Sequence, residues 1–384
     1  MKILLVSTSS GSRGGGELCL LYLGRALTLR GHEVTLWASG DPQMDELAES
    51  FRAFGNVVRE PYTNTYHRRL RSLASYADGA TARRVAASWR DLAPGVLHLN
   101  KQNLEDGLDL VEAARLSRIP ALSMIHITQS AAYLRAAQAS LRDFVSRRAL
   151  RRFPGLLVTT PGSRRDDLAA FVGDSSHIRT VLNGVPLPNL ATRDAQRSAK
   201  RRELEIADDE LLFVAVGRMM PQKRPLLFLE LAKRTLREMP EAKFLWVGDG
   251  DLSAEWDGQC AANGLGQRVH RLPWQTDVPG FLAAADVFLH VAKFEGLAFA
   301  ILEALASGLA CAITPNLLGE MPFLNSENSI AIGDDNSWVA PLRDPQRRAS
   351  LGQAARQLAE TQFSFATMAE NYEALYRESI AAKP

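Results

Sequence analysis

At 384 residues, with 46% hydrophobic and 23% charged residues, the chain has the composition of a soluble globular protein. Single hydrophobic cores rarely grow beyond about 250–300 residues, so we expect two domains. A net charge of +2 gives no sign of nucleic-acid binding. The three cysteines, Cys19, Cys260 and Cys311, form no metal-spaced pair and favour a reducing, cytosolic compartment. We expect neither a signal peptide nor a membrane span, because no apolar run approaches about 18 residues.

The two halves of the chain differ in charge. Residues 1–185 hold 24 Lys/Arg and 17 Asp/Glu, whereas the remainder holds 21 and 26. Six arginines belong to a long basic helix expected over residues 131–152, namely Arg135, Arg142, Arg147, Arg148, Arg151 and Arg152. This helix is either a solvated arginine-rich face or a surface for a membrane or an acidic acceptor.

The first half begins as a doubly wound α/β domain. Residues 3–7 predict a buried strand, followed by the loop SSGSRGGGE, a helix over 18–30 and a strand over 34–38. Gly14-Gly15-Gly16 fits neither the G-x-G-x-x-G pattern nor a P-loop. It is either a flexible turn or a bare backbone that a ligand approaches closely. Further strands are expected over 95–99, 121–125 and 156–159, with His98 near the end of the first of these strands and His126 directly after the second.

The polar residues 189–202 are expected to form a linker to a second α/β series. Its strands are predicted over 211–217, 244–247, 269–272, 287–291, 310–314 and 329–332, and its helices over 226–237, 279–284 and 297–307. A final amphipathic helix is expected over 365–380.

The stretch from Ala285 to Ala312 is the most informative part of the chain. It predicts a strand, a turn and a helix start, an arrangement that binds anions because free backbone N–H groups point out of a helix N-terminus. Glu295 in the turn and Glu303 in the helix bracket this point. Carboxylates there suit hydrogen bonds from sugar or ribose hydroxyls. The alternative is a capping Glu295 and a surface Glu303.

Several motifs occur in one order: GRMMPQKRP with Arg218 and Lys223, VGDG after a strand, LPWQTDVPGFLAAADVFL, and the two glutamates of EGLAFAILEALASG. Together with Gly14-Gly15-Gly16, His98 and VLNGV, they resemble the family-4 glycosyltransferases of the GT-B fold, most strongly over residues 211–312. The resemblance implies an α/β fold with two Rossmann-like, doubly wound domains facing across a cleft. Residues 1–185 would form the acceptor-side domain and residues 186–364 the nucleotide-sugar-binding domain, with a helix over 365–384 crossing back to the first.

The resemblance also implies a role for individual residues. Arg218 and Lys223 would neutralise the donor diphosphate, and Glu295 would hold the hydroxyls of the donor sugar. The remaining donor-binding positions are the amides of Gly296, Leu297 and Ala298 for phosphate, Glu303 for ribose, Gly15 and Gly16 near the phosphates, and Gly248 in the turn near the base. His98 would be the active-site histidine beside the sugar, and His126 would lie on the acceptor side.

The reaction implied is retaining transfer of a sugar to a hydroxyl of a glycan, lipid-linked or small-molecule acceptor, as in polysaccharide biosynthesis. No metal or other cofactor is expected, and Asp249-Gly250-Asp251 is interpreted as a turn rather than a metal-binding Asp-x-Asp. We expect a cytoplasmic protein with no nucleic-acid partner, whose basic N-terminal domain suits either peripheral contact with the inner face of the membrane or a soluble acceptor with solvated arginines.

Three departures from the family pattern bear on the donor sugar: Val291-Ala292 replace Pro-Ser, Leu297-Ala298 replace Phe-Gly, and ITPNLLGEMP follows Ala312. The alternatives to a transferase are a non-catalytic nucleotide-sugar-binding partner subunit and a sugar-nucleotide epimerase or hydrolase.

Overall fold

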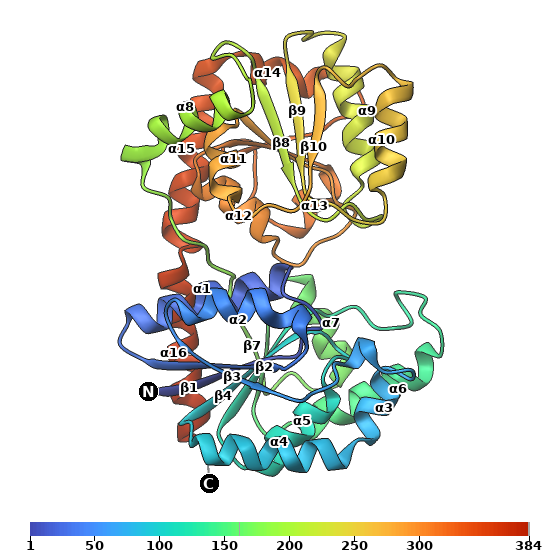
Figure 1. Cartoon of the computed structure of the whole chain (residues 1–384), viewed down its shortest axis with the longest axis vertical. Coiled ribbons are helices and arrows are strands. Elements are labelled where there is room, and N and C mark those ends of the chain that lie inside the picture. Colours follow the sequence, from blue (N-terminus) through green and yellow to red (C-terminus); the bar gives the residue numbers. More distant parts are fainter. Residues whose placement is uncertain (161, 383–384) are drawn as a thin grey trace. The chain divides into compact units, whose positions relative to one another are not determined.

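The computed structural model of the chain describes residues 1–160 and 162–382, so the last two positions of the expected 365–384 helix lie outside it. The chain divides into two compact units, one of Met1–Gly184 with Phe365–Pro384 and the other of Val185–Ser364. Over the described residues, the first unit contains a seven-stranded sheet and the second a six-stranded sheet (Figure 1). Every strand pairing in these two sheets that is described is parallel.

In the first unit the strands follow the order β3-β2-β1-β4-β5-β6-β7. They are β1 (Lys2–Ser7), β2 (Glu33–Ser39), β3 (Asn56–Glu60), β4 (Val96–Asn103), β5 (Ala121–Ile127), β6 (Leu156–Thr159) and β7 (Ile178–Thr180). The helices are α1 (Gly15–Leu29), α2 (Asp45–Arg52), α3 (Ser72–Ala77), α4 (Gly79–Leu92), α5 (Leu108–Ser117), α6 (Ala139–Arg151), α7 (Ser163–Val172) and α16 (Phe365–Ala381), with 3₁₀ turns η1 (Pro42–Met44) and η2 (Thr65–His67). Figure 1 shows α1 and α2 on one face of the sheet and α4 and α5 on the other.

In the second unit the strands follow the order β10-β9-β8-β11-β12-β13. They are β8 (Leu212–Val216), β9 (Lys243–Val247), β10 (Val269–Leu272), β11 (Val287–His290), β12 (Ala310–Ile313) and β13 (Ser329–Ala331). The helices are α8 (Arg193–Glu203), α9 (Pro225–Leu236), α10 (Ser253–Ala262), α11 (Val278–Ala284), α12 (Phe299–Ala306), α13 (Pro315–Glu320), α14 (Ala340–Arg343) and α15 (Pro345–Gln362), with 3₁₀ turns η3 (Leu190–Thr192) and η4 (Ser337–Val339).

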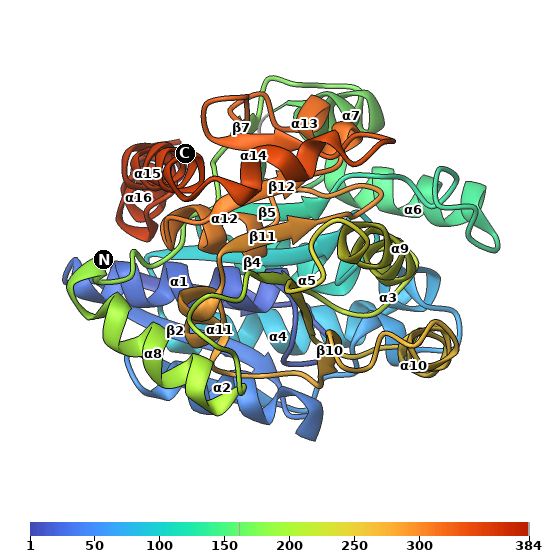
Figure 2. The same cartoon turned by 90° about the horizontal axis from the view of Figure 1, so that it is seen from above.

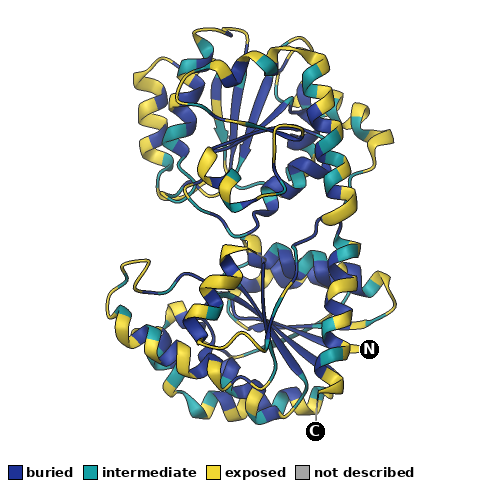
Figure 3. Cartoon of the chain, turned by 180° about the vertical axis from the view of Figure 1, so that it is seen from behind, coloured by how far each residue is buried: buried dark blue, intermediate teal, exposed yellow. Residues whose placement is uncertain are grey.

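Both sheets have the strand order of a dinucleotide-binding Rossmann fold, which confirms the predicted fold class. The central strands of each sheet are short apolar runs buried on both faces, as a parallel sheet covered by helices requires (Figure 3). In such sheets the strand order reverses beside the first strand, and ligands bind outside the carboxyl ends of the strands at that point. The reversal lies between β1 and β4 in the first unit and between β8 and β11 in the second.

Helix α16 packs within the first unit, against α1, β4 and β5. Its apolar stripe of Met368, Tyr372 and Tyr376 is buried. At the same helix, Glu373 accepts hydrogen bonds from Arg30 Nε at 2.5 Å and pairs with His32 Nε2 at 2.9 Å. Apolar burial and one ion-paired carboxylate therefore fix the C-terminal helix to the first unit.

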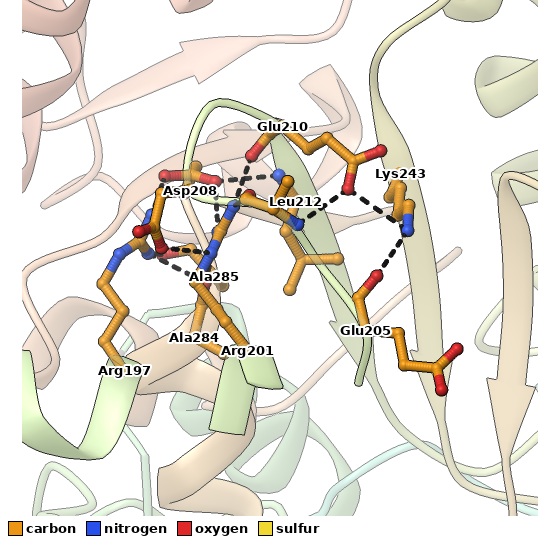
Figure 4. A network of polar contacts seen from close by, with 11 residues as sticks. Arg197, Arg201, Glu205, Asp208, Glu210, Leu212, Lys243, Ala284 and Ala285 are labelled. Atoms are coloured by element: carbon orange, nitrogen blue, oxygen red, sulfur yellow. Dashed lines mark hydrogen bonds and ion pairs between the residues drawn. The ribbon is translucent and has the colours of Figure 1, made fainter. Parts of the chain in front are cut away.

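Helix α8 is held by arginines rather than by an apolar stripe (Figure 4). Arg201, only 1% exposed, donates to the carbonyl of Ala284 at 3.1 Å and lies 3.2 Å from Asp286 Oδ2. Arg197, one turn earlier, donates to Asp286 Oδ1 at 2.7 Å. These contacts tie α8 to α11, beside which it lies in Figure 2.

Three expectations about elements are wrong. The expected linker over 189–202 is mostly the helix α8, and the helix expected from residue 131 begins only at Ala139. The strand expected to end at Leu99 continues to Asn103. In addition, β3 and α10 were not anticipated.

Candidate active site

The loops after β8 and β11 carry the cationic and acidic residues predicted for the donor site. Arg218 follows β8 and is exposed, and its guanidinium makes no hydrogen bond or ion pair within the described residues. Lys223 stands two residues before α9, and its aliphatic stem passes over Gly217: a Cβ built on that glycine would lie 3.6 Å from Lys223 Cδ. Both cations therefore belong to the segment that leaves the carboxyl end of β8.

Glu295 is the buried centre of this group. Its side chain is 7% exposed, its Oε1 accepts a short hydrogen bond from Lys223 Nζ, and Oε1 lies 3.3 Å from His290 Nε2. Burial by itself raises the pKa of Glu295, but the ammonium of Lys223 and the imidazole of His290 overcome it and lower the pKa to about 2. Glu295 is therefore ionised at neutral pH.

His290 ends β11 and is 3% exposed. Burial lowers its pKa, opposed by Glu295 and assisted by Lys223, so the ring is neutral at pH 7. Nε2 makes no hydrogen bond of good geometry within the described residues, although Glu295 is its nearest charged neighbour. Nε2 of His290 is thus a buried polar atom close to the Glu295 carboxylate that forms no good hydrogen bond with it.

The turn that presents Glu295 is fastened on both sides. Gln222 Nε2 donates to the carbonyl of Phe294 at 3.0 Å, and the amide of Lys293 donates to the carbonyl of Gln222 at 2.7 Å. Asn316 Nδ2 donates to the carbonyl of Lys293 at 2.8 Å. Such a scaffold fixes the direction of the Glu295 side chain before any ligand arrives.

The predicted phosphate-binding amides precede α12. Ala298 is its N-cap, with Gly296 and Leu297 directly before it. The side chains of Leu297 and Ala298 are 7% and 9% exposed, so the added Cβ of Ala298 packs inward. Glu303 lies in the fifth position of α12 and is half-buried. The helix start, Glu295 and Lys223 therefore lie at one point of the fold.

Gly248 holds the ends of β8 and β9 close together. Its amide donates to the carbonyl of Leu272 at 2.9 Å, and a Cβ there would lie 2.3 Å from the carbonyl oxygen of Gly217. The close contact with Gly217 is therefore enough to explain why residue 248 is a glycine, and no ligand needs to be invoked. Asp249 and Asp251 are exposed at the following turn.

No group of three or more His, Cys, Asp or Glu side chains able to hold a metal is found within residues 1–160 and 162–382.

In the first unit, the glycine loop begins α1, with Gly14 as N-cap and Gly15 as the first helical residue. The carbonyl of Gly16 accepts from Asn100 Nδ2 at 3.1 Å, and Asn100 Oδ1 lies 2.8 Å from His126 Nε2. The amide nitrogen of Asn100 donates to Gly16, so the atom facing His126 is Oδ1, which can only accept. His126 Nε2 must therefore carry the proton, which leaves Nδ1 as an acceptor. Burial lowers the pKa of His126 to about 4, so it is neutral. The structure therefore joins His126 to the glycine loop.

His98 lies elsewhere, and its expected position beside a ligand needs correction. It is the third residue of β4 and 0% exposed, covered by Tyr372 and Tyr376 of α16 at ring-centroid distances of 4.8 and 6.0 Å. Nδ1 lies 2.8 Å from the Tyr376 hydroxyl, and burial lowers the pKa to about 3. In this position His98 fastens α16 to the sheet.

Several polar residues of these two groups were not singled out from the sequence: His290, Gln222, Asn316, Asn100 and Gln102. Two of them carried a signal. His290 closes an apolar strand, and Asn100 lies in the polar end of β4, the positions where a parallel sheet presents its ligand-facing side chains. Gln102 also touches the loop: its Nε2 donates to Ser9 Oγ at 2.7 Å and would clash with a Cβ on Gly16.

Comparison with known proteins agrees with this arrangement. The family description Glycosyltransferase Family 4 matches residues 13–188, and Glycosyl transferases group 1 matches residues 210–360. A UDP-Gal:alpha-D-GlcNAc-diphosphoundecaprenol alpha-1,3-galactosyltransferase of Escherichia coli is 34% identical over 44% of this chain and 45% of its own length. The match thus spans just under half of that relative. An N-acetyl-alpha-D-glucosaminyl L-malate synthase of Bacillus anthracis is 23% identical over 99% of this chain and 98% of its own.

Solved structures share the fold across the chain. Anabaena Alr3699/HepE, crystallised in complex with UDP, superposes with a TM-score of 0.77 at 19% identity, covering 98% of this chain and 100% of that one. WaaG, a glycosyltransferase involved in lipopolysaccharide biosynthesis, gives 0.67 at 14% identity, covering 97% and 99%. The two Rossmann-like units are those of a GT-B protein. Within that class, the chain belongs to the family-4 glycosyltransferases.

Proposed function

We propose that the protein transfers a sugar from a nucleoside-diphosphate sugar to an acceptor hydroxyl, with retention of anomeric configuration and without a metal. The observation that carries the proposal is the group at the carboxyl ends of β8 and β11. There a fixed carboxylate, Glu295, lies beside an ammonium, Lys223, and a helix start, with the exposed guanidinium of Arg218 on the same loop as Lys223.

These groups suit the charge that develops during transfer. As the bond between the sugar C1 and the β-phosphate oxygen breaks, the leaving diphosphate gains negative charge, which Arg218, Lys223 and the amides before α12 stabilise. The acceptor oxygen forms the new bond to C1 on the face that the diphosphate leaves, and its proton passes to a departing phosphate oxygen. Two protein cations and a helix N-terminus supply the positive field that a divalent ion supplies elsewhere.

A lipid-linked acceptor at a membrane surface is our proposal for the other substrate. Two facts support it: the name of the Escherichia coli relative includes a diphosphoundecaprenol-linked sugar, and the N-terminal half of this chain carries the excess of basic residues. No helix among the described residues is long and apolar enough to cross a bilayer. Contact with the membrane would accordingly be peripheral.

The test is thermal stabilisation and turnover against UDP-, GDP- and ADP-sugars in EDTA. One nucleotide should raise the unfolding temperature, and slow donor hydrolysis should be lost in Lys223→Ala and Glu295→Gln. The exposed Lys233→Ala is the matched control for Lys223. Donor binding without any turnover would favour the partner subunit, and nucleotide release that no acceptor accelerates would favour a hydrolase or epimerase. No stabilisation by any nucleotide would contradict donor binding altogether.

A further inference from the structure

Exposed apolar side chains gather in one short segment of the first unit. Among the described residues, four of the ten exposed large apolar side chains fall between residues 133 and 144: Tyr133 (67% exposed), Leu134 (47%), Leu141 (52%) and Phe144 (58%). Burying such groups is favourable, so a surface that gathers them requires an explanation. The fold itself makes no use of them.

The segment has two parts, a loop over residues 131–138 and the first turns of α6. The loop projects away from the rest of the unit (Figures 1 and 3). Hydrogen bonds to α6 nevertheless fix the start of this loop: Asp143 accepts from the amides of Ala131 and Ala132 at 2.8 and 3.1 Å. Leu141 and Phe144 are three residues apart and therefore share one face of α6. Because Phe144 adjoins Asp143 in the chain, these bonds hold the start of the loop beside the same turn of α6.

The basic residues divide into two groups. Residues 128–152 contain six arginines and a single acidic residue, Asp143. Three of the arginines serve the fold: Arg142 donates to Glu105 Oε2 at 2.7 Å, Arg147 to the carbonyl of Phe171 at 2.7 Å, and Arg151 to the carbonyl of Val172. The expected arginine-rich face is thus smaller than its sequence indicates.

Of the other three, Arg152 lies within electrostatic range of Glu112, and Arg135 and Arg148 are directed to solvent. The guanidinium groups of Arg135 and Arg148 are exposed and make no hydrogen bond or ion pair with the described part of the chain. Arg135 follows Leu134 at the loop tip, and Arg148 lies one turn beyond Phe144 on the same helix face. Each of these cations therefore stands beside an exposed apolar side chain, and the segment's own carboxylate, Asp143, is occupied by backbone amides.

We propose that the loop over 131–138 and the Leu141–Phe144 face of α6 insert into the surface of an anionic membrane. Tyr133, Leu134, Leu141 and Phe144 would enter the boundary between headgroups and acyl chains, while Arg135 and Arg148 pair with lipid phosphates. Tyrosine suits this boundary because its ring is apolar and its hydroxyl stays hydrated. The partner is then the membrane that presents the proposed lipid-linked acceptor. The purpose of this contact rests on the proposed function, whereas binding to the membrane does not.

The experiment is co-sedimentation of the full chain with phosphatidylglycerol/phosphatidylcholine vesicles and with phosphatidylcholine alone, without donor. We expect binding to the anionic vesicles that weakens as salt is raised, since screening removes the arginine contribution. Tyr133→Ser combined with Leu134→Ser should weaken binding at least tenfold, and Arg135→Gln combined with Arg148→Gln should remove most of its salt dependence. Leu29→Ser is the matched control, because Leu29 is 70% exposed at the end of α1.

All four proteins should unfold at the same temperature, because the substituted side chains are exposed. Lys223→Ala should bind vesicles normally while losing turnover, so that failure of the membrane proposal and failure of the transferase proposal give different results. No sedimentation of the native chain at low salt would overturn the inference. So would self-association, seen by size-exclusion light scattering, that the Tyr133/Leu134 variant abolishes while vesicle binding persists unchanged.

Discussion

Lys223 pairs with Glu295 in the structure, and under the proposed function it would also bind the donor diphosphate. The diphosphate would compete for the same ammonium with a greater charge. When Lys223 turns to the phosphate, the buried carboxylate loses its main partner, which is costly unless another donor replaces it. His290 Nε2, 3.3 Å away and not yet well bonded, is placed to do so.

Replacing His290 by leucine should therefore affect the sugar more than the nucleotide. We expect kcat/KM for the donor sugar to fall about tenfold, equivalent to about 1.4 kcal/mol, the scale of one hydrogen bond to a charged group. The Kd of the free nucleoside diphosphate should stay within about twofold. Steady-state kinetics and calorimetric titration measure the two quantities. His270→Leu, at an exposed position on β10, is the control. Full activity in His290→Leu would mean that Lys223 alone positions Glu295.

Two histidines of the first unit, His126 and His98, should also differ in how far their replacement changes activity. His126→Ala should lower kcat about a hundredfold or more, because it removes a positioned hydrogen-bonding group at the glycine loop. His98→Phe should keep activity within about threefold but cost roughly 1–2 kcal/mol of stability, since the Tyr376 hydroxyl loses its partner. Turnover and urea unfolding of both variants check this. A hundredfold loss in His98→Phe at normal stability would restore the role expected from its motif.

His98 and His126 show what the local sequence can and cannot predict about the role of a single residue. Both histidines follow similar apolar runs, and both were expected near strand ends. What separates them is α16, whose Tyr372 and Tyr376, nearly 280 residues further along the chain, pack against the His98 ring. No local pattern around residue 98 contains that information.

At the scale of elements, α16 depends on the ion pair of Glu373 with Arg30. The hydrogen bonds from Arg30 lower the pKa of Glu373, opposed by burial and assisted by His32, to about 2, compared with an ordinary value of 4.5. Because the folded value is the lower one, this contribution to stability is complete above about pH 4.5 and is lost as the pH falls towards 2.

Glu373→Gln should therefore destabilise the protein by roughly 2 kcal/mol at pH 7, because Arg30 and His32 lose a buried partner. The difference from the native chain should shrink between pH 4.5 and pH 2, as measured by urea unfolding across that range. Glu370→Gln is the control: Glu370 also contacts Arg30, at 3.0 Å, but its side chain is 59% exposed, so its removal should change little. A difference that stays constant with pH would contradict the assignment.

Most elements could be predicted because apolar runs alternate with helical segments at the usual spacing. The failures have tertiary causes. Residues 131–138 are rich in alanine, leucine and arginine, which favour a helix, yet Asp143 binds the amides of Ala131 and Ala132, and Arg135 and Gln138 adopt positive φ values of 52° and 56°. In α8 the buried face consists of arginines that bind Asp286. The sequence therefore shows no apolar periodicity from which this helix could be predicted.

At the scale of the whole molecule, both units repeat one arrangement of strands and polar residues. Each has a reversal of strand order beside its first strand, and in each the residues joined into a network lie just beyond that point: His126, Asn100 and Gly16 in one, and Lys223, Glu295 and His290 in the other. The α/β alternation and the motif order were enough to predict this class of fold. Val291, Ala292, Leu297 and Ala298, which depart from the family pattern, have buried apolar side chains, so their types alone do not define a donor sugar.

The configuration of the reaction product tests the proposed metal-independent transfer with retention directly. The measurement is proton NMR of the anomeric centre formed when the stabilising nucleotide sugar is incubated in EDTA with the chain and a lipid-linked acceptor. We expect a new glycoside with the anomeric configuration of the donor, formed by the native chain and lost in Lys223→Ala. An inverted product, or turnover that requires an added divalent cation, would contradict it.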